Sequence, residues 1–166
     1  MLSAETAAGK YPVKTVEAMA RVCEGAERQR ASMGIGRRAD RLFESVDEAI
    51  AMAVMYAANH LDVKAIIALT ESGSTALWMS RIRSGIPIYA MTRHEATRRR
   101  VTLYRGVYPI AFDVMHSNPD QVLRASVEEL ARRNLVVKGD YVICTKGELS
   151  GVAGGTNSLK ILRVGD

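Results

Sequence analysis

The stretch KAIIALT-ESGST-ALWMSRIR, residues 64–83, contains the pattern that decides the fold. Residues 64–70 form a short, continuous apolar run, which is typical of a strand covered on both faces. A polar loop, residues 71–75, separates this run from a segment with the composition of a helix. A buried strand followed by a loop and a helix predicts one unit of an α/β domain with a mostly parallel sheet.

The same alternation continues along the chain. Further strands are expected at residues 86–92, 106–114, 141–147 and 158–164, and further helices at 46–61, at 94–105 and from Asn118 to about Asn134. Pro109 predicts an edge position or a bulge for its strand. Only a Gly-rich loop joins the last two strands, and because it is too short for a parallel crossover, the final strand should pair antiparallel. We therefore expect a three-layer α/β/α sandwich around a five-stranded, mostly parallel sheet with an antiparallel last strand.

Two helices are expected before the first strand. Pro12 is a favourable first-turn residue for a helix from Val13 toward Arg30. The apolar stripe of that helix consists of Val16, Met19, Ala20 and Cys23. Ser45 and Glu48 form a capping-box pattern at the start of the helix at residues 46–61. That second helix is apolar around much of its circumference, and burial in the core and burial in a subunit contact explain this composition equally well.

The composition limits the class of protein. A chain of 166 residues with 48% hydrophobic content can bury one compact core. No signal-peptide pattern opens the chain, no apolar run approaches the length of a membrane span, and Cys23 and Cys144 are far apart, with both expected to be inert core residues. These features predict a soluble, cytoplasmic protein. The formal charge of +5 favours an anionic partner, but an aromatic content of 5% leaves few rings for stacking bases, which argues against nucleic acid.

The polar loop after strand 64–70 is the first candidate site. Ligands of open α/β sheets gather at the carboxyl ends of the strands, where hydroxyls, amide groups and glycine together suit a phosphate. The residues concerned are Thr70, Ser72, Gly73, Ser74 and Thr75. A plain capping turn explains the same residue types, and Glu71 opposes an anion unless its carboxylate points away.

A second candidate is the Gly-rich segment at residues 145–157, which includes Gly151 and offers closely spaced amide donors. It lacks the residue order of a nucleotide P-loop, and a flexible hairpin loop is the alternative. The run from Arg98 to Arg100 spreads around a helix instead of forming a stripe, which favours a solvated or interface helix. His60, His94 and His116 have no metal-ligand spacing, so we expect no metal site and no catalytic constellation.

Taken together, these segments resemble pyruvate kinase over essentially the whole chain. Residues 1–12 resemble the end of that family's (β/α)8 barrel, and the loop from Thr70 to Thr75 resembles its effector phosphate loop. Residues 90–93 and 103–107 are similar to sequences that the family has at these places. Lys146-Gly147 and residues 155–161 resemble its closing segment. The resemblance implies the last strand and helix of the barrel at residues 1–32, a linker at 33–44 and the C-terminal α/β domain at 45–166.

The resemblance also implies a function. The intact enzyme would be a homotetrameric glycolytic phosphotransferase that moves a phosphoryl group from phosphoenolpyruvate to ADP with Mg²⁺ and K⁺. Its catalytic and metal-binding groups would precede Met1, so this chain is expected to bind no cofactor and to be inactive alone. The stripe of the helix at residues 13–30 should then be exposed, because it would face that barrel.

What remains is an effector and subunit-interface domain. The resemblance implies that Thr70, Ser72, Gly73, Ser74 and Thr75 bind the effector's phosphate and that the segment around Gly151 closes over it. Family members that bind fructose 1,6-bisphosphate commonly have a basic or amide residue where Glu71 stands, which favours a sugar monophosphate or AMP here. The expected partners are this effector and further copies of the chain, without nucleic acid or membrane. A free-standing sugar-phosphate or nucleotide sensor is the alternative.

Overall fold

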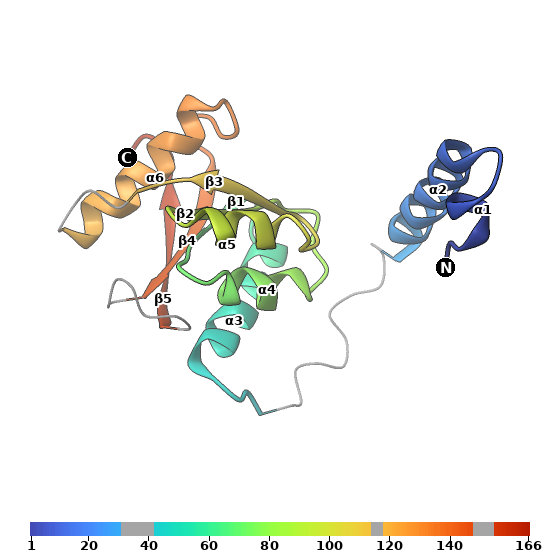
Figure 1. Ribbon diagram of the computed structural model, residues 1–166. Helices are drawn as coiled ribbons and strands as arrows, with labels where there is room; N and C mark the ends of the chain where they lie inside the picture. The colour runs from blue at the N-terminus through green and yellow to red at the C-terminus, as the bar shows by residue number, and fades with distance from the viewer. Residues whose placement is uncertain (31–41, 114–117, 148–154) are drawn as a thin grey trace. The chain divides into compact units, whose positions relative to one another are not determined.

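The computed structural model describes residues 1–30, 42–113, 118–147 and 155–166. The chain divides into two compact units, Met1–Ala39 and Asp40–Asp166 (Figure 1). The predicted division into residues 1–32, 33–44 and 45–166 stays a prediction, because a division by compactness does not establish where family domains begin.

The described residues of the first unit form two helices, α1 (Ala4–Ala7) and α2 (Pro12–Arg30). The strand expected here is not present among described residues 1–30, since nothing in them supplies a second strand with which to pair. The predicted stripe on α2 is exposed, with Val16 retaining 53% of its accessible surface. Cys23, expected as a core residue, is exposed as well, because among described residues 1–30 the short α1 is the one element against which α2 packs.

The second unit is built on a five-stranded sheet in the order β3-β2-β1-β4-β5. Its strands are β1 (Val63–Leu69), β2 (Ile88–Thr92), β3 (Val107–Ala111), β4 (Tyr141–Gly147) and β5 (Thr156–Arg163). The first four strands pair in parallel, and β5 pairs antiparallel with β4. The chain therefore winds outward from β1 to β3 and then returns to the other side of β1 to form β4.

Helices cover both faces of this sheet. The helices are α3 (Val46–His60), α4 (Ser74–Ser80), α5 (Glu95–Val101) and α6 (Pro119–Arg132). In Figure 1, α3, α4 and α5 lie on one side of the sheet and α6 lies on the other. Successive side chains of β1 point to opposite faces of the sheet. Ile66 packs in the cluster with α3 and α4, whereas Ile67 packs in the cluster with α6. The predicted three-layer sandwich with an antiparallel last strand is thus confirmed.

The helix α3 divides its apolar residues between core and solvent. Ala51, Val54 and Met55 are completely buried against the sheet, whereas Val46 and Tyr56 are 62% and 60% exposed. The Ser45 side chain caps the helix by accepting a hydrogen bond from the backbone N–H of Glu48. The reciprocal bond of the capping box goes one residue further back, because the Glu48 carboxylate accepts from the N–H of Glu44 at 2.9 Å.

Other local predictions are confirmed or corrected. Pro109 lies on β3, an edge strand of the sheet. Cys144 is buried on β4, and this burial raises the pKa of its thiol to about 12, which makes it unreactive. The helix α5 ends at Val101 instead of continuing to residue 105, because Leu103 and Tyr104 bond to carbonyl groups three residues back and the chain leaves the helical path.

Candidate functional site

The candidate loop lies where the winding of the sheet reverses. Residues 70–73 connect the carboxyl end of β1 to the start of α4, and the N–H of Thr70 donates to the carbonyl oxygen of Met91 at the end of β2. The neighbours of β1 on its two sides are β2 and β4, which the chain reaches in opposite directions. In open α/β sheets, this reversal opens a crevice at the carboxyl ends of the strands, and ligands bind there.

Gly73 gives the loop its shape. Its φ of 84° is in the left-handed region, where side chains are strained, and it immediately precedes α4. A Cβ atom added to Gly73 would lie 2.8 Å from the Cγ1 atom of Val101, a buried residue at the end of α5. Only glycine allows the loop to approach α5 this closely.

Two of the predicted hydroxyl groups cap the loop as acceptors. The Oγ1 atom of Thr70 accepts from the N–H of Gly73 at 2.9 Å, and the Oγ atom of Ser72 accepts from the N–H of Ser74 at 3.3 Å. Within the described part of the chain, no hydrogen bond uses the hydroxyl protons of Thr70 and Ser72. A hydroxyl group can accept and donate at once, so these two side chains remain able to donate to a ligand.

The other two hydroxyl groups are committed as donors. Ser74 donates to the carboxylate of Asp47 at 2.7 Å, and Asp47 is 4% exposed in the first turn of α3. Thr75 donates to the Oγ1 atom of Thr156 at 2.7 Å, and both residues are buried. Ser74 and Thr75 therefore attach the loop to α3 and to the start of β5. The structure thus brings the five predicted residues of the loop together. Thr70 and Ser72 keep hydroxyl protons that can be donated, whereas the hydroxyls of Ser74 and Thr75 bond to other elements and Gly73 shapes the backbone.

The second predicted segment is described only at its ends. Gly151 lies outside the described residues, so its predicted role stays a prediction. Thr145 is buried near the end of β4, and its hydroxyl donates to the carbonyl oxygen of Ile67 at 3.4 Å. Thr156 opens β5 and contacts Thr75 of the candidate loop. The described ends of the Gly-rich segment thus lie at the same edge of the sheet as the loop.

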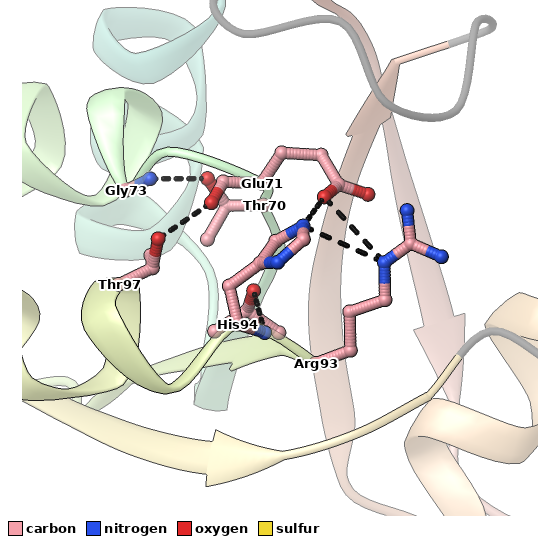
Figure 2. A network of polar contacts seen from close by, with 7 residues as sticks. Thr70, Glu71, Gly73, Arg93, His94 and Thr97 are labelled. Carbon is pink, nitrogen blue, oxygen red and sulfur yellow. Dashed lines mark hydrogen bonds and ion pairs between the residues drawn. The ribbon is translucent and has the colours of Figure 1, made fainter.

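The charges beside the loop come mainly from the connection between β2 and α5. The carboxylate of Glu71 contacts the Nε2 atom of His94 and lies 3.8 Å from the Nε atom of Arg93 (Figure 2). Arg100, on α5, donates from a guanidinium nitrogen to the carbonyl oxygen of Ser72 at 3.5 Å. The carboxylate of Glu71 thus points toward the side chains of Arg93 and His94.

Sequence reasoning did not assign a site role to Arg93, His94 or Asp47, and it included Thr156 only as part of the Gly-rich segment at residues 145–157. The sequence did contain a signal for Arg93 and His94, because they follow the strand predicted at residues 86–92. Thr70 was selected for a similar reason, since it lies at the carboxyl end of the strand predicted before it. Asp47 and Thr156 are 27 and 81 residues away from their partners in the chain, and no local pattern indicates such contacts.

A metal site finds no support in these residues. Among the residues that the structure describes, no group of three or more His, Cys, Asp or Glu side chains could hold a metal ion. The same residues include no helix that is long and apolar enough to cross a membrane.

The fold and the loop define an α/β domain with a candidate anion site at the reversal of its sheet. A family model described as the alpha/beta domain of pyruvate kinase matches residues 48–162. The chain is 53% identical to pyruvate kinase II of Salmonella typhimurium and 50% identical to the pyruvate kinase of Buchnera aphidicola subsp. Schizaphis graminum, with 99% of this chain and 34% of each relative covered. The chain belongs to the pyruvate kinase family, and it spans about a third of the length of these relatives.

Proposed function

We propose that the chain forms the C-terminal regulatory and subunit-interface domain of a cytoplasmic pyruvate kinase and that residues 70–75 bind a phosphorylated effector. The observation that carries the effector site is the position of this loop at the reversal of the sheet, next to the start of β5. The hydroxyl groups of Thr70 and Ser72 would donate to the phosphate, and Arg100 adds a positive charge beside Ser72.

The charges around the loop favour an effector with one phosphate group. Arg93 and Arg100 bring two positive charges to the loop, whereas Glu71 and the buried Asp47 bring two negative charges. The resulting field is weak, and it would not compensate a second phosphate group as well as the first. A sugar monophosphate or AMP therefore fits the site better than fructose 1,6-bisphosphate.

Calorimetric titration of the purified chain tests this proposal. We expect AMP or a sugar monophosphate to bind with micromolar affinity and fructose 1,6-bisphosphate to bind more weakly. The double variant T70V/S72A should bind at least about tenfold more weakly, because it lacks two donors to a charged group. Thr102→Ala is the matched control, since its exposed hydroxyl bonds only to the carbonyl of Arg99 at the far end of α5. Equal affinity in T70V/S72A and wild type would exclude the loop as the effector site.

The proposed role is regulatory and not catalytic. Supplied with phosphoenolpyruvate, ADP, Mg²⁺ and K⁺, the purified chain should release no pyruvate above background. Phosphoryl transfer needs metal ions and positioned charge around the transferred group, and in the proposed enzyme both belong to the barrel. Pyruvate release by this chain alone would contradict the assignment.

The edge of β5 supports the interface part of the proposal. This strand is eight residues long and lies at one end of the sheet, beside β4 only. Ile161, the sixth residue of this strand, is 45% exposed. The opposite edge strand, β3, contains Pro109, which has no N–H for pairing. An edge strand without proline and with an exposed apolar side chain suits pairing with a second copy of the chain, as expected within a homotetrameric enzyme.

A further inference from the structure

The proposed effector loop contains a residue that should repel its ligand. Glu71 lies between Thr70 and Ser72, the two residues whose hydroxyl protons are available. Its side chain is 26% exposed, so its charge is only partly screened by water. An anion can bind beside Glu71 only if the carboxylate is kept away from the hydroxyl groups.

Three residues hold Glu71, namely Arg93 and His94 in the connection between β2 and α5, and Thr97 in α5 itself. Its carboxylate contacts the Nε2 atom of His94 and lies 3.8 Å from the Nε atom of Arg93, which itself lies 3.5 Å from the same His94 nitrogen. Its backbone carbonyl accepts from the hydroxyl of Thr97 at 2.7 Å. Figure 2 shows the side chain of Glu71 extending from the loop toward Arg93 and His94. Both the backbone and the side chain of Glu71 are thus fixed.

Arg93 and His94, which together form a clamp on the carboxylate of Glu71, directly follow the end of β2. The N–H of His94 donates to the hydroxyl of Thr92 at 3.2 Å, and Thr92 is buried as the last residue of that strand. His94 therefore starts from a fixed backbone position. Glu95, the acidic residue that follows His94, pairs with Arg99 one helical turn further along α5.

We propose that Arg93 and His94 are positioning residues for the anion site: they hold the carboxylate of Glu71 away from the loop hydroxyls and offset its charge. This inference rests on the proposed effector site and names two residues that set its affinity. It differs from a direct role, in which Arg93 or His94 would contact the phosphate. A positioning role disappears when Glu71 has no charge, whereas a direct role does not.

A double-mutant cycle on the full chain separates these roles. The probes are AMP and inorganic phosphate, and the quantity measured is the dissociation constant. We expect Glu71→Gln to tighten binding and His94→Ala to weaken it, each by roughly threefold to thirtyfold for one charge moved by a few ångströms near the surface. In the E71Q background, His94→Ala should change affinity less than about twofold. Arg93→Ala should behave like His94→Ala.

Conservative variants and a charge control complete the test. His94→Gln keeps an N–H donor and Arg93→Lys keeps the charge, so both should recover most of the affinity that the alanine variants lose. Arg99→Gln removes one positive charge from α5 without touching Glu71 and should leave affinity within about twofold of wild type. Thermal unfolding of each variant checks that the domain remains folded.

Each outcome has a distinct meaning. Equal losses from H94A in the Glu71 and E71Q backgrounds would show direct contact and would overturn the positioning role, while the effector site would stand. Unchanged affinity in both E71Q and H94A would overturn it too. If neither wild type nor E71Q binds either probe, the proposed effector site fails and the clamp fails with it.

Discussion

At the scale of single residues, Gly73 shows why the loop before α4 requires glycine. Gly73→Ala should destabilise the domain by about 2 kcal/mol or more, because alanine is strained at a φ of 84° and its Cβ would clash with Val101. Gly106→Ala measures the backbone strain alone, because Gly106 has a φ of 68° and a Cβ added there meets no atom within 4 Å. This variant should lower the free energy of unfolding by about 1 kcal/mol.

Gly85→Ala provides the baseline for this comparison. This glycine has no positive φ, and a Cβ there meets no atom within 4 Å. Chemical denaturation of the three variants should give a loss of stability in the order G73A, G106A, G85A, with G85A near wild type. A stability loss in G73A no greater than in G106A would show that the loop can move away from α5.

Hydrogen-bond roles at the candidate loop could not be predicted from residue types. The sequence offered four hydroxyl groups that looked equivalent, yet Thr70 and Ser72 act as acceptors while Ser74 and Thr75 donate to other elements. The distinction depends on Asp47 and Thr156, which reach the loop only through the packing of α3 and β5. The position of the loop was predictable because strand, polar loop and helix follow one another within about twenty residues.

At the scale of elements, the buried contact between Thr75 and Thr156 joins α4 to β5. Replacing one threonine by valine leaves the other hydroxyl without its buried partner, so T75V or T156V alone should cost about 1–3 kcal/mol. The double variant T75V/T156V removes both polar groups with little change of shape and should be closer to wild type than the sum of the single variants.

The stability of the four proteins, measured by urea denaturation, gives the coupling between the two residues. We expect a coupling free energy of about 1 kcal/mol or more. Strictly additive losses would contradict a direct hydrogen bond and would leave the attachment of β5 to the loop without support.

Element types were predictable because helices and strands have different apolar periods, but some element ends were not. β4 was predicted with its observed bounds, since a Gly-Asp turn precedes it and glycine ends it. The predicted end of α5 was wrong by four residues, because residues 102–105 retain a helical composition while their hydrogen bonds form a tighter turn. The bonds between Glu71 and its clamp depend on the parallel pairing of β1 with β2, a contact that the sequence pattern does not specify.

At the scale of the whole molecule, self-association should depend on the edge of β5. Sedimentation of the chain over a range of concentrations should show reversible association. Ile161→Lys should shift this equilibrium toward the monomer, because it replaces an exposed apolar side chain of an edge strand by a second lysine beside Lys160, and charge on an edge strand opposes pairing. Leu103→Lys is the matched control, since Leu103 is 86% exposed in the turn after α5 and does not belong to the sheet.

The exposed stripe on α2 is a second surface that could drive association, and its contribution has to be measured separately. Val16→Lys places the same charge within that stripe, where the valine is 53% exposed. If β5 forms the subunit contact, I161K should dissociate the oligomer in both the wild-type and V16K backgrounds, and V16K alone should leave a dimer. If V16K alone gives a monomer and I161K has no more effect than L103K, the interface is on α2, and the role proposed for β5 is wrong.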